Sequence, residues 1–233
     1  MKEKIKSLVF IVTIFIVSLH CSNKSGTSGI RIYIASDSLL NNHTVSLSES
    51  QEKILKGAKE NLSEGAVYDI SMAYYVLKYK DGNFTGQEVY PDGDLDPTTG
   101  VCTDVIIRSL RKAGIIDLQK AVQEDIIKNG NEYPFSRWGN KKPDSNIDHR
   151  RVMNLEVWFS GHWNTQDGNN FMPGDIIVWD MNEDGASDHI GIVSDKKENE
   201  RYFVIHNHPD PGHIAEEDKL FKWKISGHYR FRE

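Results

Sequence analysis

The chain has 233 residues, of which 38% are hydrophobic and 27% are charged, and its formal net charge is −6. These proportions are typical of a soluble globular protein and exclude a disordered or collagen-like chain. The acidic balance argues against nucleic acid as a partner, because no Lys/Arg stripe with interleaved aromatic residues accompanies it. We expect one medium-sized domain, with a monomer as the default state.

The N-terminus has the pattern of a bacterial export signal. Three lysines within the first six residues precede an apolar run over residues 8–19, which is short for a membrane span. Cys21 follows this run, as in the lipid-attachment site of bacterial lipoproteins. We predict a signal peptide over residues 1–21, lipidation at Cys21, and a polar tether over 22–47. An uncleaved N-terminal anchor is the alternative. The expected location is the cell envelope, with a lipid anchor in the membrane.

Helices are predicted in the first half of the remaining chain. Ser48-x-x-Gln51 has the form of a capping box and precedes apolar residues at helical spacing, so a helix should begin there. Another helix, capped by Asp117, is predicted to run to about Lys128. Two prolines and a glycine make residues 91–97 a loop. Residues 133–171 form a long region rich in aromatic and turn residues, and long structured loops tend to build sites.

Cys102 stands at the predicted start of a further helix, whose apolar residues recur up to Ala113 before Gly114. A thiol in the first helical turn lies near unpaired backbone N–H groups and the positive end of the helix dipole, which stabilise a thiolate. The other cysteine falls in the export signal, so the mature chain has one thiol. A lone cysteine is often a small buried hydrophobic residue. It becomes a candidate nucleophile where a histidine can activate it.

The last third of the chain is predicted to be β-structure. Residues 174–179, 189–193, 202–206 and 228–231 read as strands joined by short turns, which favours an antiparallel meander. Helices followed by strands indicate an α+β domain, with the cysteine helix covering one face of the sheet.

Two histidines occupy adjoining strand ends. His189 begins one predicted strand and His206 ends the next, so antiparallel pairing places them together at one edge of the sheet. With the helix N-terminus packed there, Cys102, His189 and His206 form a Cys–His–His array. His189 would take the thiol proton and His206 would orient the imidazole of His189. Backbone amides at the helix start would stabilise an oxyanion.

This arrangement resembles the NlpC-type superfamily of papain-like cysteine peptidases, which cut peptide bonds in bacterial peptidoglycan. Pro173-Gly174-Asp175 matches a turn common before the histidine strand of that superfamily, and Tyr90 lies twelve residues before Cys102, as an oxyanion tyrosine often does. The strings Gly-Val-Cys-Thr-Asp-Val, Asn-Ile-Asp-His-Arg-Arg-Val, His-Ile-Gly-Ile-Val and Gly-His-Tyr-Arg resemble an uncharacterised bacterial family within it. The likeness covers about residues 50–232. Val101 and Thr103 stand where the superfamily's Asp-Cys-Ser-Gly has Asp and Ser.

The resemblance implies a papain-like fold over residues 48–233 and an exported hydrolase that cleaves an amide bond, with peptidoglycan or another envelope component as substrate and no cofactor. Two alternatives stay open: a catalytically silent envelope-binding module, and an acyltransferase or thioesterase acting on a lipid. Charged residues near the motifs are weaker candidates for substrate binding, and they are Asp104, Arg108, Asp148, His149 and Arg150. For Asp148, His149, Arg150 and the neighbouring Arg151, a solvated ion-pair cluster is the competing interpretation.

Other site interpretations are less favoured. His206, His208 and His213 with Cys102 could bind zinc, but they lack the usual ligand spacing. Residues 180–188 copy the first part of a calcium loop without its final Glu, which favours a plain turn. Asn207 or Asp188 could replace His206 as the orienting residue, but strand alternation places Asn207 on the opposite face from His206.

Overall fold

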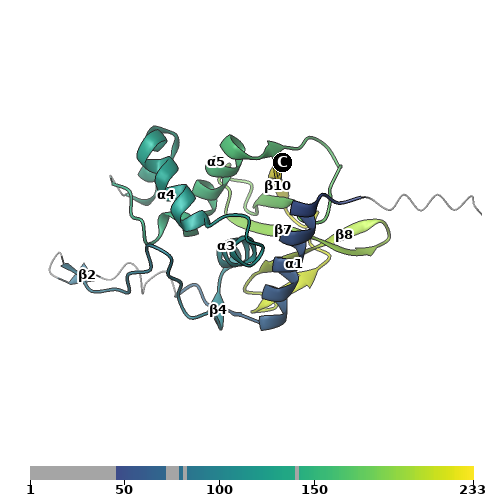
Figure 1. The fold of residues 1–233 in the computed structure, drawn as a ribbon, viewed down its shortest axis with the longest axis horizontal. Coiled ribbons are helices and arrows are strands. Elements are labelled where there is room, and N and C mark those ends of the chain that lie inside the picture. Colours follow the sequence, from purple (N-terminus) through teal and green to yellow (C-terminus); the bar gives the residue numbers. More distant parts are fainter. Residues whose placement is uncertain (1–45, 72–78, 81–82, 140–141) are drawn as a thin grey trace, which may run out of the picture. The chain divides into compact units, whose positions relative to one another are not determined.

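The computed structural model describes residues 46–233 except 72–78, 81–82 and 140–141. The predicted signal peptide, the lipidation site Cys21 and nearly all of the tether lie outside the described residues. The described part has one set of helices packed on an antiparallel sheet, which confirms the α+β prediction (Figure 1).

The sheet has six strands in the order β5-β10-β6-β7-β8-β9, and every neighbouring pair is antiparallel. Their bounds are β5 Asn164–Thr165, β6 Ile176–Asp180, β7 His189–Glu198, β8 Arg201–Asn207, β9 Ile214–Glu217 and β10 Lys224–Arg230. The meander prediction is correct for β6, β7 and β8. It is wrong for the last predicted strand, because β10 pairs with β6 on the far side from β8. Strand β9, which takes the place beside β8, was not predicted.

Two short strand pairs lie outside this sheet. β1 (Val67–Tyr68) pairs in parallel with β4 (Thr99–Gly100), and β2 (Tyr79–Lys80) pairs with β3 (Asn83–Phe84) in antiparallel fashion. The pairing of β1 with β4 matters for the site, because β4 leads directly into the cysteine helix and β1 brings a second segment beside it.

The longer helices are α1 (Glu49–Glu64), α3 (Cys102–Lys112), α4 (Leu118–Asn129) and α5 (Val152–His162). Short 3-10 helices follow α4 and precede α5: η1 (Gly130–Glu132), η2 (Phe135–Trp138) and η3 (Asp148–Arg150). The capping predictions are confirmed. Ser48 Oγ accepts the Gln51 N–H at 3.3 Å, and Asp117 caps α4 by accepting the Gln119 N–H at 3.0 Å.

Helix α5 was not predicted within the region 133–171. Its buried residues include Leu155, Trp158 and Phe159, and aromatic residues have modest helix propensity. Packing decides the conformation here: the Phe159 ring lies 5.8 Å from that of Tyr229 on β10 and 4.8 Å from that of Trp163. An aromatic-rich segment can therefore be helical when a core surrounds it.

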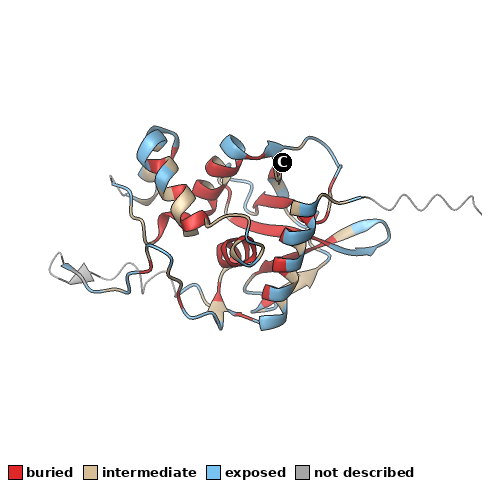
Figure 2. Ribbon diagram, viewed as in Figure 1, coloured by how far each residue is buried: buried red, intermediate tan, exposed pale blue. Residues whose placement is uncertain are grey.

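Helix α3 is the central helix of the domain. Residues Cys102 to Leu110 are all buried, so the helix is mostly red in Figure 2, and it packs against both α1 and the sheet strand β7. The core on this side of the sheet includes Ile106, Leu110 and Ile190. A second cluster, which includes Trp179, Val193 and Val204, covers the other face. Both faces of the sheet are therefore buried, and the cysteine helix covers one of them, as predicted.

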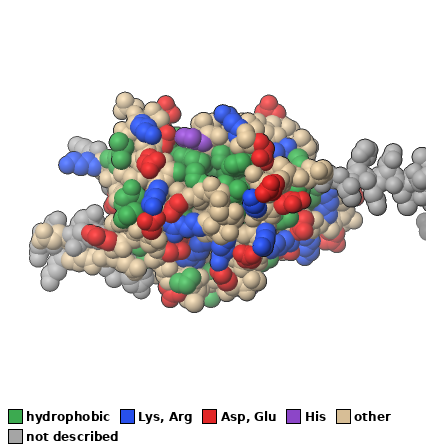
Figure 3. Space-filling model, in the orientation of Figure 1, with side chains coloured by type: hydrophobic (Ala, Val, Ile, Leu, Met, Phe, Trp, Pro, Cys, Tyr) green, Lys and Arg blue, Asp and Glu red, His purple; other side chains and the backbone are tan. Residues whose placement is uncertain are grey.

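The surface mixes both signs of charge. Figure 3 shows Lys/Arg and Asp/Glu side chains interspersed over the face that it presents, with hydrophobic side chains between them. Among the described residues, we find no helix both long and apolar enough to cross a membrane.

Candidate active site

Cys102 is the first residue of α3 and a free cysteine, as predicted, and it is 9% exposed. Asp104 stabilises this helix start: its Oδ2 accepts the Val101 N–H at 2.9 Å. Acidic residues in the first turn also interact favourably with the helix dipole. The local sequence therefore fixes the Cys102 backbone at the point where a strand turns into a buried helix.

A cavity of about 220 Å³ adjoins Cys102. One side is formed by the start of α3 and the residue before it, another by the η3 region, and β1 and the residue preceding β7 complete it. Its lining residues are Tyr68, Ile70, Val101, Cys102, Thr103, Asp104, Ile147, Arg150, Val152 and Asp188. The thiol therefore stands at a mixed polar and apolar space of the size of one or two amino-acid side chains.

The two predicted histidines meet as expected. His189 Nε2 lies 2.8 Å from His206 Nδ1, and His206 Nε2 lies 3.0 Å from Glu217 Oε2 on β9. The rings of Trp179 and Trp223 flank His189, with centroid distances of 5.5 and 5.2 Å. A buried relay of two imidazoles therefore ends on a carboxylate that is 25% exposed.

This relay fixes the histidine tautomers. A carboxylate can only accept, so His206 Nε2 carries a hydrogen towards Glu217 and its Nδ1 is left as an acceptor. His189 Nε2 must then donate to His206, which leaves a lone pair on His189 Nδ1. That nitrogen is the one able to take a proton from a thiol.

The chain neighbours of His189 lie at the Cys102 site. Asp188 lines the Cys102 cavity, and the backbone amide of Ile190 donates towards the Cys102 sulfur. Among the hydrogen bonds of the described residues, none joins Cys102 to His189 directly. The His189 ring packs near Trp179, on the face of the sheet opposite to the one that α3 covers. The structure therefore brings the backbone next to His189 to Cys102 and assembles the histidine pair, but it does not place the imidazole beside the thiol.

The pKa values differ from the expectation of a thiolate. Burial raises the pKa of Cys102 to about 12, and the nearby Asp104 charge adds to this, while backbone amides of Ile190, Thr103 and Cys102 act in the opposite direction. The helix-start effect is therefore present but outweighed by desolvation. Burial also lowers the pKa of His206 to about 4 and that of His189 well below its ordinary value, with neighbouring histidines adding to the shift at His189. Thiol and imidazoles are neutral at pH 7.

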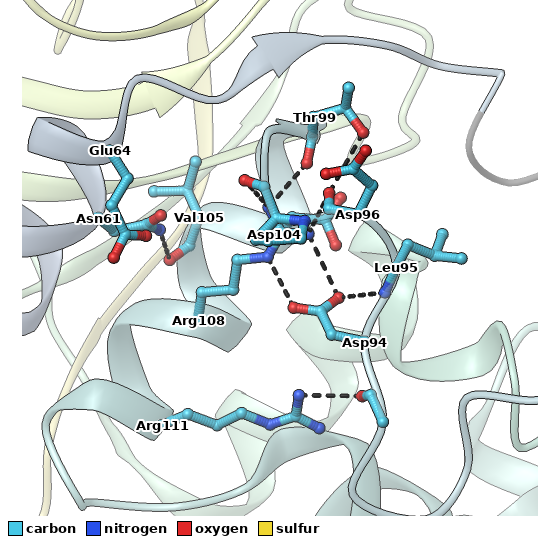
Figure 4. Close-up of polar contacts among 12 residues, drawn as sticks. Asn61, Glu64, Asp94, Leu95, Asp96, Thr99, Asp104, Val105, Arg108 and Arg111 are labelled. Carbon is cyan, nitrogen blue, oxygen red and sulfur yellow. Dashed lines mark hydrogen bonds and ion pairs between the residues drawn. The ribbon is translucent and has the colours of Figure 1, made fainter.

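The charged candidates form a buried ion network instead of a free binding patch. Asp94 accepts Arg108 Nε at 2.8 Å (Figure 4) and Arg150 at 2.7 Å. Arg150 also pairs with Asp104, and Arg108 donates to the Thr99 carbonyl at 2.7 Å. Two carboxylates thus face two guanidinium groups, and the network fixes the loop before α3 to η3.

Of the five charged candidates, Asp104 and Arg150 line the Cys102 cavity, whereas Arg108, Asp148 and His149 do not. Arg108 binds Asp94 and the Thr99 carbonyl, and so holds the loop that precedes α3. Asp148 and His149 are 1% and 2% exposed. Burial raises the pKa of Asp148 to about 6 and, together with the Arg150 and Arg111 charges, lowers that of His149 to about 3. The solvated-cluster interpretation also fails, because these residues are buried.

The tyrosine at the cavity is Tyr68 on β1, and the predicted oxyanion residue Tyr90 is not among the lining residues. The Tyr90 N–H donates to Asn146 Oδ1 at 3.1 Å. The Tyr90 side chain is near Lys120 on α4, because its charge is one of those that raise the pKa of Lys120. Burial raises the pKa of Tyr68, and the Cys102 charge adds to this, so the two groups are neighbours. The twelve-residue spacing therefore does not place Tyr90 beside the thiol.

The other site interpretations receive no geometric support. Asn207 Nδ2 donates to the carbonyls of Ala66 and Gly100 at 3.2 Å, away from His189. In the turn 180–188 the carboxylates are hydrogen-bonded to backbone groups of the turn itself. Asp180 accepts the N–H groups of Asp184 and Gly185, and Asp188 accepts that of Met181. In the described part of the chain, no group of three or more His, Cys, Asp or Glu residues is arranged to hold a metal ion.

Sequence reasoning missed Glu217 and Tyr68. Glu217 lies on an unpredicted strand, and its role depends on β9 pairing with β8, where His206 is opposite Ala215. Tyr68 reaches the cavity through the parallel pairing of β1 with β4, 34 residues away from Cys102 in sequence. Residues 214–217 (Ile-Ala-Glu-Glu) show no alternation of apolar and polar residues, so no local signal pointed to a further strand.

Comparisons with known proteins place this chain in a family. A family model described as a domain of unknown function, DUF1287, matches residues 56–231, which include Cys102, His189, His206 and Glu217. The chain is 43% identical over 183 residues to the uncharacterized protein YijF of Escherichia coli strain K12, and the match covers 76% of this chain and 80% of YijF. No solved structure matches the chain. The chain therefore belongs to the DUF1287 family.

Proposed function

We propose that this protein is a papain-like cysteine hydrolase of the NlpC type, exported to the bacterial envelope and anchored there through Cys21. Its reaction would be cleavage of an amide bond, with peptidoglycan as the substrate class. The observation that carries the proposal is the relay His189–His206–Glu217, with contacts of 2.8 and 3.0 Å, which begins on the strand whose Ile190 amide reaches the Cys102 sulfur. The predicted export signal and the resemblance to NlpC-type motifs support the compartment and the substrate class.

In this mechanism the resting pair is a neutral thiol and a neutral imidazole. His189 Nδ1 takes the Cys102 proton as the sulfur attacks the substrate carbonyl, and the positive charge formed is stabilised through His206 by Glu217. The proton then passes to the leaving amine, which yields a thioester on Cys102. Water, deprotonated by His189, hydrolyses that thioester and restores the thiol.

The oxyanion that forms in each step needs donors near the sulfur. The backbone amides of Cys102 and Thr103 at the start of α3 are unpaired by the helix itself and act on the sulfur. The Tyr68 hydroxyl at the cavity is a further donor, and we assign it the role predicted for Tyr90. A helix start and one side chain would then form the oxyanion hole.

A catalytically silent binding module is favoured by a different observation. Cys102 is 9% exposed and its pKa is raised to about 12, which describes an unreactive thiol. The hydrolase proposal requires the His189 ring, which packs near Trp179 on the other face of the sheet, to turn around the start of β7 to the sulfur when substrate binds. The two functions therefore differ in whether an acyl group is ever attached to Cys102.

The test is to incubate the mature chain with soluble peptidoglycan fragments and with acyl esters, and to measure new amines and acyl-enzyme mass. Wild type should release amines, and a mass increase on the peptide containing Cys102 should appear on rapid quenching. Cys102→Ala and His189→Ala should abolish both signals, while His213→Ala should keep them. Binding of fragments with no amine release and no adduct would establish the silent module instead, and reaction of esters alone would indicate the lipid-directed enzyme.

A further inference from the structure

The turn that joins β9 to β10 exposes aromatic and basic side chains together. Residues 218–224 read Asp-Lys-Leu-Phe-Lys-Trp-Lys, so two aromatic residues alternate with lysines. Phe221 is 52% exposed, and it is the one aromatic side chain among the large hydrophobic residues that the described part of the chain exposes. A single exposed hydrophobic residue needs no explanation, but one that stands in an aromatic and basic segment indicates a surface with a partner.

The turn is fixed by its own backbone and by one buried side chain. The Lys222 N–H donates to the Lys219 carbonyl at 2.9 Å. Leu220 is 1% exposed, and its carbonyl accepts Trp179 Nε1 at 3.0 Å. Because Leu220 takes the place in the core, the next side chain, Phe221, is left outside it. The exposure of Phe221 therefore follows from the packing of the turn.

Uncharged side chains adjoin Phe221. Its ring meets that of Phe171 edge-to-face, with a centroid distance of 5.4 Å. The residues at 169–170, just before Phe171, are both asparagine and both exposed. Trp223 is half-buried, and its ring lies 5.2 Å from that of His208. Aromatic and neutral polar groups of this kind suit the boundary between water and lipid, where aromatic side chains accumulate.

The three lysines of the turn are available to a partner. Lys222 is exposed, and no acid among the described residues pairs with it. Lys219 Nζ lies 3.8 Å from Glu217, and Lys224 Nζ, on a side chain 54% exposed, lies 3.7 Å from Asp180. Both distances exceed hydrogen-bond length, and such surface pairs contribute little. The ammonium groups can therefore turn to an anion outside the chain.

The acids next to the turn already have partners. Asp218 pairs with Arg201, and Glu217 accepts from His206 at 3.0 Å. The Asp180 side chain is 3% exposed and accepts two N–H groups of its own turn. The whole chain has a net charge of −6, but charges more than about 8 Å away are screened at physiological salt. The lysines of the turn therefore dominate the charge that a close partner meets.

This combination fits an anionic lipid bilayer. Lysines bind lipid phosphates while their methylene stems lie along apolar surface, and an exposed aromatic ring is buried at the boundary of headgroups and acyl chains. A soluble anion would use the lysines and leave Phe221 in water. The lipid anchor predicted at Cys21 and the tether over 22–47 would keep the domain close to a bilayer, because a flexible chain of that length spans about 25–30 Å.

We propose that the 218–224 turn docks the domain on an anionic bilayer surface, with Phe221 entering the headgroup boundary and Lys219, Lys222 and Lys224 contacting lipid phosphates. The tether limits only the distance of the domain from the bilayer, and the docked turn would fix its orientation. The proposal rests on the proposed envelope location, but not on catalysis at Cys102.

The experiment measures sedimentation of the unacylated chain from residue 22 on with lipid vesicles. Thr44–Glu233 form one compact unit, so this chain keeps the described domain. Vesicles of phosphatidylglycerol and phosphatidylcholine in equal parts should bind the chain, and vesicles of phosphatidylcholine alone should bind it more weakly. Raising the salt from about 0.15 M to about 1 M should weaken binding, because it screens the lysines.

Phe221→Ser and Lys222→Gln test the two parts of the surface. Each should weaken binding to the anionic vesicles about fivefold, which for Lys222 is the effect of one lysine near an anionic surface. Ile127→Ser on α4, at a position 73% exposed, and Lys56→Gln on α1, at a position 78% exposed, are the matched controls and should bind as wild type does. All four changes are at exposed positions and should keep cooperative thermal unfolding.

Lack of binding to the anionic vesicles, or the same loss in the control variants, would overturn the proposal. Wild-type binding by Phe221→Ser beside weakened binding by Lys222→Gln would also overturn it, because the turn would then attract anions in general. Phe221→Ser should release amines from soluble peptidoglycan fragments at the wild-type rate, and Cys102→Ala should bind vesicles as wild type does. Failure of the docking and failure of the hydrolase are thus distinguished.

Discussion

Glu217 is the residue that sets the direction of the histidine relay. Its carboxylate accepts from His206, and both tautomers follow from that single contact. In Glu217→Gln, an amide N–H can face His206 and favour the reverse tautomers, with a hydrogen on His189 Nδ1. We expect acylation of Cys102 to slow by up to about 10⁴-fold, the loss that a carboxylate-to-amide change causes in a Ser-His-Asp triad. The measurement is the rate of amine release from peptidoglycan fragments.

Glu216→Gln is the matched control for that change. Glu216 is the neighbouring residue on β9, and it pairs with Lys59 of α1 at 2.5 Å on the other face of the sheet. The control should lose some stability and keep the rate constant of the folded protein. Equal rates in the two variants would remove Glu217 from the mechanism.

The Asp104 carboxylate stabilises the fold through its ion pair, but its charge disfavours the thiolate form of Cys102. Its carboxylate is 2% exposed and pairs with Arg150, and its charge contributes to the raised pKa of Cys102. Asp104→Asn should lower that pKa and speed alkylation at a fixed pH. It should also lower the free energy of unfolding by about 3–5 kcal/mol, because a buried ion pair is broken. Iodoacetamide rates across pH and urea unfolding measure the two effects.

Asp94→Asn separates the two effects of Asp104. Asp94 pairs with Arg108 and Arg150 in the same network, but it does not adjoin the thiol. This variant should lose stability and leave the pH profile of Cys102 alkylation unchanged. The same shift of the profile in both variants would indicate a general loosening of the network and contradict a direct effect of the Asp104 charge.

At the scale of elements, α1 and α3 approach each other closely at Gly57. A Cβ atom there would lie 2.3 Å from the Ser109 carbonyl oxygen of α3, so the helices would have to separate. Gly57→Ala should lower the free energy of unfolding by about 1–3 kcal/mol, even though alanine is the better helix former. Urea unfolding gives the comparison.

Gly161→Ala in α5 is the matched change without the contact. A Cβ at Gly161 meets nothing within 4 Å, so only helix propensity acts and stability should rise by up to about 1 kcal/mol. A similar change in stability at both positions would mean that the close approach of α1 and α3 has no energetic consequence.

Elements with a local signal were predictable, and those without one were not. Helix α1 begins at its capping box and α4 at Asp117, because caps satisfy N–H groups within a few residues of sequence. Helix α5 and strand β9 lack such signals, and their conformation depends on packing against β10 and β8. The position of β10 beside β6 likewise has no local cause.

At the scale of the whole molecule, buried histidines make the fold sensitive to acid. The pKa of His149 is lowered to about 3 and that of His206 to about 4, below the ordinary value of 6.5 that applies to the unfolded chain. Between pH 6.5 and about 4 the unfolded chain therefore binds protons that the folded chain does not, and the free energy of unfolding falls as pH falls. Each such group contributes about 1.4 kcal/mol per pH unit.

Asp148 acts in the opposite direction, because its pKa is raised to about 6 and the folded chain takes up its proton first. One acid offsets one histidine, and the remaining histidines give a net loss of stability in acid. His149→Phe should reduce the difference between urea unfolding free energies at pH 7 and pH 4.5. His162→Phe, at a position 42% exposed, is the matched control. An unchanged difference in His149→Phe would contradict this account.

The sequence by itself determined the local features of this protein: the cysteine at a helix start, the capped helices, four strands of the last third and the adjacency of His189 to His206. Each follows from periodicity, capping or antiparallel pairing between consecutive segments. Only the tertiary structure decided the rest: Glu217 behind the relay, Tyr68 instead of Tyr90 at the cavity, and the burial that raises the pKa of Cys102. These depend on segments far apart in sequence and on the exclusion of water, which no local pattern records.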